Sequence, residues 1–290
     1  MKLAAIDIGS NAARLLIVDV LENKGEVEFN KVNLVRVSLR LGFDVFENGS
    51  IGTTKKIMLI NTMQAFQHLM NVYKVEAVRA CATSAMRDAS NSEKIIQEVK
   101  QKTNIKIQVI SGEEEASLIF QTHVAEKLNK DHVYLYIDVG GGSTELSFFT
   151  DGKQIYSKSF NIGTIRLLSS KWDEEEWLIM KDSIKENVKG KLPVTAIGSG
   201  GNINKVFSLS KTKEGKPISL RLLKNYHKKL SALSLHDRIE QFKLKEDRAD
   251  VIVPALQIYT NVMSWANVNE IYVPKIGISD GLIRKMYFEI

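Results

Sequence analysis

Two short segments of the chain each place an aspartate directly before glycine and small polar residues. They read IDIGSN at 6–11 and IDVGGGST at 137–144. Glycine lets the backbone approach a ligand closely, and successive N–H groups can then converge on an anion such as phosphate. Bare phosphate would repel the carboxylates of Asp7 and Asp138, so these suit a Mg²⁺ ion. Side-chain donors to phosphate are available from Ser10, Asn11, Ser143 and Thr144.

Each of these glycine turns is expected to connect two strands. Residues 3–8 and 13–20 flank the first turn, and residues 133–139 and 146–149 flank the second. A dinucleotide-binding fold would instead follow its glycine turn with a helix. One glycine turn is weak evidence for a site, because such hairpins are common. The repeated order of strand, Asp, Gly, small polar residue and strand indicates an internal duplication.

The rest of the chain alternates helical and strand patterns, which predicts an α/β protein. The sequence Ser90–Glu93 resembles a capping box, with Asn91 as a competing cap. Strands are expected at 75–82, 105–110, 194–197 and 270–273, and helices at 54–73, 113–128, 173–187, 202–209, 248–265 and from about 279 to the end.

Composition narrows the class of protein. The chain has 290 residues, of which 44% are apolar and 26% charged, as in ordinary globular proteins. Its single cysteine, Cys81, excludes an intrachain disulfide, and we expect it to be a small buried residue. No apolar run is long enough for a membrane span, so we expect a cytoplasmic protein. The net charge of +6 favours acidic partners.

Further motifs accompany the two turns. They are ATSAMRDASN at 82–91, VISGEEEASLIF at 109–120, GSGGN at 198–202, RADVIVPAL at 248–256 and SDGLIR at 279–284. With the turns, they resemble the exopolyphosphatase and guanosine pentaphosphate phosphohydrolase (Ppx/GppA) family, within the actin-like ATPase superfamily. The second turn is the most specific of these motifs.

The resemblance implies an α/β fold of two actin-like (ribonuclease H-like) domains flanking an interdomain cleft. Domain I would comprise residues 1–118 plus 279–290, and domain II residues 119–278. We expect a short form of the family, without the C-terminal helical domains of longer relatives. A homodimer is also implied by the resemblance alone.

The implied activity is Mg²⁺-dependent exopolyphosphatase, with short chains preferred. Glu115 would be the catalytic base and Arg87 would stabilise charge on the transferring group. Asp138, Asp7 and Glu145 would hold the metal. The remaining implied phosphate contacts come from Gly9, Ser10, Asn11, Arg14, Gly140, Gly141, Gly142, Ser143, Thr144, Gly200 and Gly201. The implied partner is inorganic polyphosphate or guanosine pentaphosphate; we expect neither nucleic acid nor membrane.

Several alternatives remain open from the sequence. The substrate could be guanosine pentaphosphate, which Arg14 favours. The chain could be a phosphotransferase of the same superfamily, or a non-catalytic phosphate or nucleotide sensor. Simpler interpretations also exist for single residues. Acids at 113–115 suit a helix start, Arg87 suits a surface ion pair, and Glu145 suits an ordinary strand position.

Overall fold

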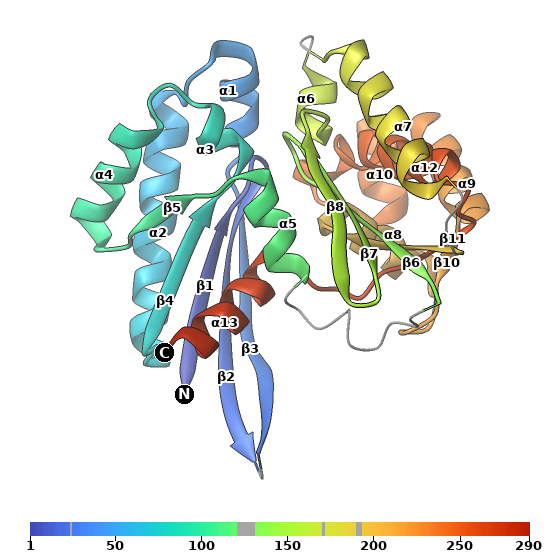
Figure 1. Ribbon diagram of the computed structural model, residues 1–290. Helices are drawn as coiled ribbons and strands as arrows, with labels where there is room; N and C mark the ends of the chain where they lie inside the picture. The colour runs from blue at the N-terminus through green and yellow to red at the C-terminus, as the bar shows by residue number, and fades with distance from the viewer. Residues whose placement is uncertain (24, 121–130, 170–171, 190–192) are drawn as a thin grey trace. The chain divides into compact units, whose positions relative to one another are not determined.

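A computed structural model describes residues 1–23, 25–120, 131–169, 172–189 and 193–290. The chain divides into two compact units (Figure 1). Unit 1 comprises Met1–Thr122 and Gly277–Ile290, and unit 2 comprises His123–Ile276. Each unit is built on its own sheet, so the protein is a two-unit actin-like α/β fold, as the sequence predicted.

The sheet of unit 1 has the strand order β3-β2-β1-β4-β5. Its central strand β1 pairs antiparallel with β2 and parallel with β4. Residues 3–8 of β1 are all buried, which requires cover on both faces of the sheet. The five strands are β1 (Lys2–Ile8), β2 (Ala12–Asn23), β3 (Glu26–Ser38), β4 (Ala77–Ala82) and β5 (Ile107–Val109).

Helices provide that cover. Helix α2 packs with α4, and α13 crosses the strands, where it contacts β1, β2, β4 and α5 (Figure 1). The apolar spacing of α2 buries Leu59, Met63, Phe66 and Met70 on one side, as a helical period requires. The helices of unit 1 are α1 (Leu41–Asn48), α2 (Thr53–Tyr73), α3 (Ser84–Asp88), α4 (Ser92–Thr103), α5 (Gly112–Phe120) and α13 (Ile278–Glu289).

Gly281 allows α13 to pass directly against α5. A Cβ atom at this position would lie 1.9 Å from the carbonyl oxygen of Leu118, far inside van der Waals contact. We expect Gly281→Ala to lower the free energy of unfolding by about 3 kcal/mol, because two helix backbones must separate. Gly277→Ala is the matched control, since its Cβ would meet nothing within 4 Å. Urea unfolding of both variants tests this, and equal stabilities would contradict the close crossing.

The sheet of unit 2 has the order β10-β11-β9-β6-β7-β8. Its strands are β6 (Val133–Val139), β7 (Thr144–Thr150), β8 (Lys153–Phe160), β9 (Val194–Ser199), β10 (Ile218–Ser219) and β11 (Glu270–Tyr272). Helix α12 packs on β6 and on five other helices of the unit, α6, α7, α8, α9 and α11. The helices are α6 (Thr164–Leu168), α7 (Glu174–Val188), α8 (Gly201–Ser210), α9 (Leu220–Ser231), α10 (Leu235–Phe242), α11 (Glu246–Ala249) and α12 (Ile252–Trp265).

The strand orders confirm the internal duplication. The order β3-β2-β1-β4-β5 of unit 1 recurs in unit 2 as β8-β7-β6-β9-β11. In both sheets the strand before a glycine turn pairs antiparallel with the strand after it, and parallel with a later strand. The two glycine turns therefore occupy equivalent places in the two units.

Two local predictions were wrong. The single helix expected at 248–265 is interrupted between α11 and α12. Pro254 explains this, because it lacks an N–H and its ring clashes with the carbonyl four residues earlier, that of Asp250. The expected capping box Ser90–Glu93 does not form. The helix begins after Asn91, whose side chain instead exchanges hydrogen bonds with the backbone of Ile51.

The helix expected at 113–128 is described as far as Phe120; residues 121–130 lie outside the described part. Cys81 is a buried free cysteine, as expected. Within the described ranges, no helix combines the length and apolarity needed to cross a membrane.

Candidate active site

The two glycine turns share the same backbone hydrogen bond. Gly9 N–H donates to the carbonyl of Ala12 at 3.0 Å, and Gly140 N–H donates to the carbonyl of Ser143 at 2.9 Å. The strand registers then pair Asp7 with Arg14 in unit 1, and Asp138 with Glu145 in unit 2. The two turns thus have the same backbone hydrogen bond. The residue that faces the aspartate is a cation in the first turn and an anion in the second.

In the first turn, the aspartate already has a cation. Arg14 Nη1 lies 2.6 Å from Asp7 Oδ2, and the Asp7 side chain is only 3% exposed. A charge-assisted hydrogen bond of this kind offsets the cost of burying the carboxylate. Asp7 as a metal ligand stays a prediction, and its observed partner is Arg14. The Arg14 side chain is 34% exposed, so part of the guanidinium faces solvent.

In the second turn, two carboxylates face each other. Asp138 and Glu145 are both buried, and one oxygen of each lies within 4.8 Å of the other. Buried like charges disfavour each other's ionised form unless a cation lies between them. Carboxylate oxygens are the ligands that Mg²⁺ prefers. These residues therefore fit the predicted metal, and the role of Asp138 and Glu145 as its ligands stays a prediction.

Hydroxyl groups orient Glu145. Ser143 Oγ donates to Glu145 Oε1 at 2.7 Å, and Ser159 Oγ donates to the same oxygen at 2.8 Å. Thr144 Oγ1 donates to the carbonyl of Ile162 at 2.5 Å. Ser143 and Thr144, predicted as phosphate donors, thus direct their hydroxyls to protein acceptors. The sequence analysis missed Ser159, which only the pairing of β7 with β8 brings to Glu145.

The backbone of the second turn is held from one side. Its carbonyl groups at Gly140 and Gly141 accept hydrogen bonds from the N–H groups of Thr164 and Ile165, at 3.0 and 2.7 Å. Arg166 Nε donates to the carbonyl of Gly142 at 2.9 Å. In the described part of the chain, the N–H groups of Gly141 and Gly142 have no protein acceptor. These N–H groups are suited to an anion.

Gly163 allows the segment that donates these hydrogen bonds to lie directly against the turn. The sequence motifs did not indicate a role for Gly163. A Cβ atom there would lie 2.4 Å from the carbonyl carbon of Gly142 and 2.5 Å from that of Gly141. We expect Gly163→Ala to displace the turn and reduce phosphate release by about tenfold or more, since small misplacements of binding groups cost large factors in rate. Steady-state phosphate release together with circular dichroism tests this. Wild-type rates in a folded variant would contradict it.

The three acids at the start of α5 differ in their surroundings. Ser111 and Glu114 form a reciprocal capping box: Ser111 N–H donates to Glu114 Oε2 at 2.9 Å, and Glu114 N–H donates to Ser111 Oγ at 3.1 Å. Glu113 is exposed, whereas Glu115 is 5% exposed. The helix-start interpretation thus applies to Glu114. Capping does not explain the burial of Glu115, the predicted base, because the capping box is formed by Glu114.

Arg87 is held close to the start of α5. Its Nη1 donates to the carbonyl of Ile110 at 2.9 Å. Among the described residues it forms no ion pair, so the surface-pair interpretation is not observed. Ser10 Oγ also lies 2.8 Å from Ser84 Oγ, three residues before Arg87. These residues follow β1, β4 and β5, which run parallel, so their carboxyl ends meet at one edge, where α/β sheets bind ligands.

The pKa of Cys81, on β4, is affected by carboxylates near this edge of the sheet. Burial, followed by the nearby carboxylates of Asp7 and Glu115, raises the pKa of its thiol well above the ordinary value. The thiol is therefore protonated at neutral pH and is not a nucleophile. The effect also shows that Asp7 and Glu115 lie close to one position of β4.

The motif at 198–202 lies beside Asp138. Gly200 has φ of 107°, and a Cβ there would lie 3.2 Å from Asp138 Oδ1. Buried Tyr259 donates to the carbonyl of Ser199, and burial and then the Asp138 carboxylate raise its pKa well above the ordinary value. The predicted contact of Gly200 and Gly201 with phosphate remains a prediction. Tyr259, which the sequence analysis missed, fixes the backbone before them.

The duplicated sheets define an actin-like α/β fold, and its glycine turns and buried carboxylates suit a phosphate group and a cation. The chain belongs to the Ppx/GppA phosphatase family, whose model matches residues 20–288. This confirms the family that the motifs resembled.

Individual relatives agree with this assignment. The bifunctional 3-dehydroquinate synthase/phosphatase of Fusobacterium nucleatum is 30% identical over 90% of this chain, which spans 43% of that protein. Exopolyphosphatase 1 of Mycobacterium tuberculosis is 24% identical over 98% of this chain and 88% of its own length.

Solved structures show the same fold. The Aquifex aeolicus member of the Ppx/GppA family has a TM-score of 0.76 and 26% identity, covering 100% of this chain and 98% of its own. An exopolyphosphatase from Cytophaga hutchinsonii has a TM-score of 0.86 and 24% identity, covering 100% and 99%.

Proposed function

We propose that this protein is a Mg²⁺-dependent exopolyphosphatase that releases orthophosphate from the end of inorganic polyphosphate. Membership of a phosphatase family supports the hydrolysis of a phosphate bond. The observation that carries the proposal is the buried pair Asp138–Glu145 beside a glycine turn with available N–H groups. A site of this kind suits a cation and a phosphate together.

In this proposal Glu115 accepts a proton from the water that attacks the terminal phosphorus. Its burial on α5 holds the carboxylate in one position. Arg87, anchored on the carbonyl of Ile110, contacts oxygens of the transferring phosphoryl group. Asp138 and Glu145 would hold a Mg²⁺ ion, which would supply positive charge to offset the charge on those oxygens.

Asp7 takes a different task from Asp138 in this scheme. Its ion pair with Arg14 fixes a guanidinium beside the first turn. A guanidinium has five N–H donors in a fixed fork, which suits it to contact a phosphate oxygen as well as a carboxylate. We infer that Asp7 is a positioning residue for Arg14, and that the first turn binds phosphate through Arg14 and backbone N–H groups.

Guanosine pentaphosphate is the second candidate substrate. The same partly exposed Arg14 favours it, because a fixed guanidinium suits an additional pyrophosphate group. A preference for this nucleotide that Arg14→Lys weakens, while polyphosphate hydrolysis persists, would support the second candidate.

One assay distinguishes the candidates. Orthophosphate release should be measured with Mg²⁺ or EDTA, on polyphosphates of several lengths, guanosine pentaphosphate and ATP. We expect metal-dependent release, fastest on short polyphosphate. A clear preference for ATP would refute both substrates. Tight polyphosphate binding without release, at any metal concentration, would instead indicate a sensor.

A further inference from the structure

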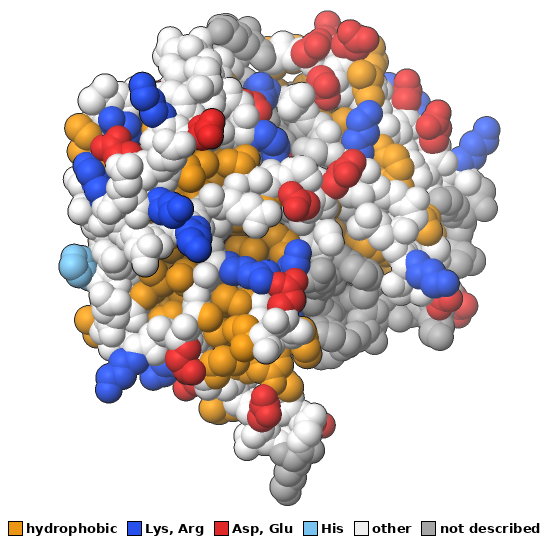
Figure 2. Space-filling model, turned by 60° about the vertical axis from the view of Figure 1, so that its left-hand side comes forward, with side chains coloured by type: hydrophobic (Ala, Val, Ile, Leu, Met, Phe, Trp, Pro, Cys, Tyr) orange, Lys and Arg blue, Asp and Glu red, His pale blue; other side chains and the backbone are white. Residues whose placement is uncertain are grey.

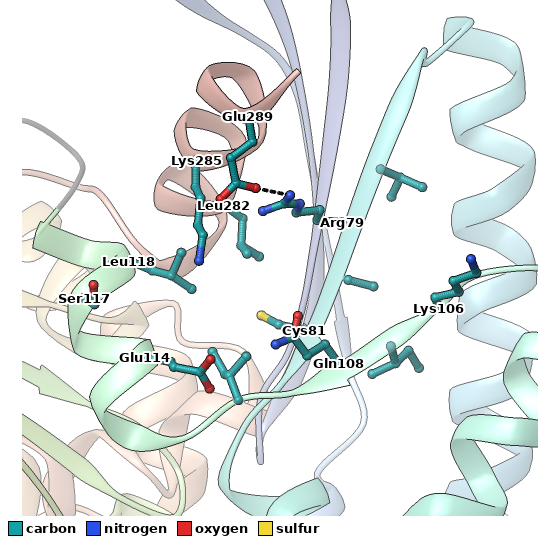
Figure 3. Close-up of a pocket in the computed structure, with 14 residues that line it drawn as sticks. Arg79, Cys81, Lys106, Gln108, Glu114, Ser117, Leu118, Leu282, Lys285 and Glu289 are labelled. Atoms are coloured by element: carbon teal, nitrogen blue, oxygen red, sulfur yellow. Dashed lines mark hydrogen bonds and ion pairs between the residues drawn. The ribbon is translucent and has the colours of Figure 1, made fainter.

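Unit 1 contains a pocket away from the glycine turn. It lies between β4, β5, α5 and α13 and has a volume of about 440 Å³ (Figure 3). Pockets that bind small organic molecules measure about 300–1,000 Å³. All of its lining residues belong to unit 1, and no role predicted for this protein involves the pocket.

The lining of the pocket carries three cations, Arg79, Lys106 and Lys285, and two acids, Glu114 and Glu289, so one positive charge is left over. At its rim Arg79 forms an ion pair with Glu289. Lys285 lies one helical turn before Glu289, whose carboxylate is directed to Arg79. In the described ranges Lys285 has no ion-pair or hydrogen-bond partner. Figure 3 shows Lys285 extending from α13 into the space between α13 and α5.

The acid on the opposite wall forms no ion pair with this lysine in the described ranges. Glu114 contributes to the lining from α5, and its Oε2 accepts the N–H of Ser111 in the capping box. Gln108 on β5 adds an amide group, which can donate or accept a hydrogen bond. The polar groups of the pocket therefore also include the ammonium groups of Lys106 and Lys285, the Arg79 guanidinium and the Ser117 hydroxyl.

The remaining walls are apolar. They consist mainly of Ile107, Ile110, Leu118 and Leu282, with the thiol of Cys81 facing the same space (Figure 3). Figure 2 shows hydrophobic side chains gathered on the face of unit 1 above the β2–β3 hairpin, with charged side chains among them. Polar atoms nevertheless make up more of the exposed lining than apolar atoms, so the apolar side chains offer a ligand a smaller contact surface beside the polar groups.

We propose that this pocket binds a small organic anion, with a carboxylate or phosphate group on a compact apolar body. The anionic group pairs with Lys285, and the apolar body lies against Leu118 and Leu282. An anion is favoured over a cation because the lining carries three cations against two acids, and Arg79 and Glu289 already pair with each other.

An occupant would also touch the helix that carries the catalytic glutamate. Glu114, Ser117 and Leu118 line the pocket, and Glu115 lies in the same turns of α5. Cys81 lies in the pocket wall and senses the charge of Glu115. We therefore expect occupancy to change the hydrolytic rate, an expectation that rests on the proposed function.

The binding test uses 1-naphthoate, with neutral 1-naphthamide as its matched control, by isothermal titration calorimetry. We expect 1-naphthoate to bind about tenfold more tightly than the amide, and Lys285→Glu to weaken naphthoate binding about tenfold. Lys285→Arg should retain binding. Lys94→Glu makes the same charge change at an exposed position of α4, and should have no effect.

Equal binding of acid and amide, no binding of either, or an unaffected Lys285→Glu variant would overturn the site. A parallel titration with 1-naphthylphosphonate distinguishes a carboxylate from a phosphate ligand. Adding 1-naphthoate to the phosphate-release assay then tests the coupling. We expect an altered rate in the wild type and none in Lys285→Glu.

The two proposals fail separately. Naphthoate binding with no phosphate release from any substrate would refute the proposed function and leave the pocket assignment standing. Binding with an unchanged hydrolytic rate would refute only the coupling through α5.

Discussion

Glu115→Gln is expected to reduce the rate of phosphate release by about 10²–10⁴, the usual contribution of a general base. Glutamine has nearly the same shape as glutamate but cannot accept a proton from water. Glu115 takes no part in the capping box of α5, so the variant should fold as the wild type does. The loss should appear in kcat, with little change in KM, because the proton transfer belongs to the transition state.

Its neighbours serve as matched controls. Glu113→Gln changes the same charge at an exposed position and should keep the wild-type rate. Glu114→Gln weakens the capping box, so it should lower stability by about 1 kcal/mol while activity persists. If Glu115→Gln hydrolyses polyphosphate at the wild-type rate, Glu115 is not the base. If all three variants lose activity equally, the effect is one of helix stability.

Glu145→Gln and Asp138→Asn are each expected to weaken Mg²⁺ binding by at least about 100-fold, the upper range for loss of even an outer-shell group. Removing one of two buried like charges also relieves their repulsion. The metal-free variants should therefore be more stable than the metal-free wild type, whereas added Mg²⁺ should stabilise only the wild type strongly. Calorimetric titration with Mg²⁺ and thermal unfolding with and without the metal measure both effects.

The equivalent change in the first turn is the control. Asp7→Asn removes a carboxylate at the matching strand position, but there it breaks an ion pair with Arg14. We expect this variant to be less stable and to retain Mg²⁺ affinity. If Asp7→Asn abolishes Mg²⁺ binding, the predicted role of Asp7 as a ligand is correct, and its pairing with Arg14 does not describe the metal-bound protein.

The fold class and the internal duplication could both be predicted from the sequence. Both depend on local patterns: the apolar run before each aspartate, the glycines after it, and the strand that follows. The registers around the turns follow from the short connections, because a tight hairpin fixes which residues of its two strands face each other. The facing pairs Asp7–Arg14 and Asp138–Glu145 could therefore be predicted from the sequence. So could the difference between them, since Asp7 faces a cation and Asp138 faces an anion.

Contacts between distant segments of the chain could not be predicted from local sequence patterns. Gly163 and Tyr259 act on the second turn through contacts that join distant segments of unit 2. The pattern Ser90–Glu93 before α4 resembles the box that Ser111 and Glu114 form at the start of α5. The box at Ser90 does not form, and the side chain of Asn91 hydrogen bonds with the backbone of Ile51, which lies far away in the sequence. The interruption before α12 could have been predicted from Pro254, because proline cannot continue the hydrogen bonding of a helix interior.

The last helix has a consequence for synthesis of the protein on the ribosome. Helix α13 packs on β1 and β2, so unit 1 is assembled from the first and the last segments of the chain. Unit 2 is a continuous segment, and it is translated completely before α13 exists. Continuous domains generally fold as they emerge. We therefore expect unit 2 to fold first, while the earlier-made strands of unit 1 wait for the final residues to complete their cover.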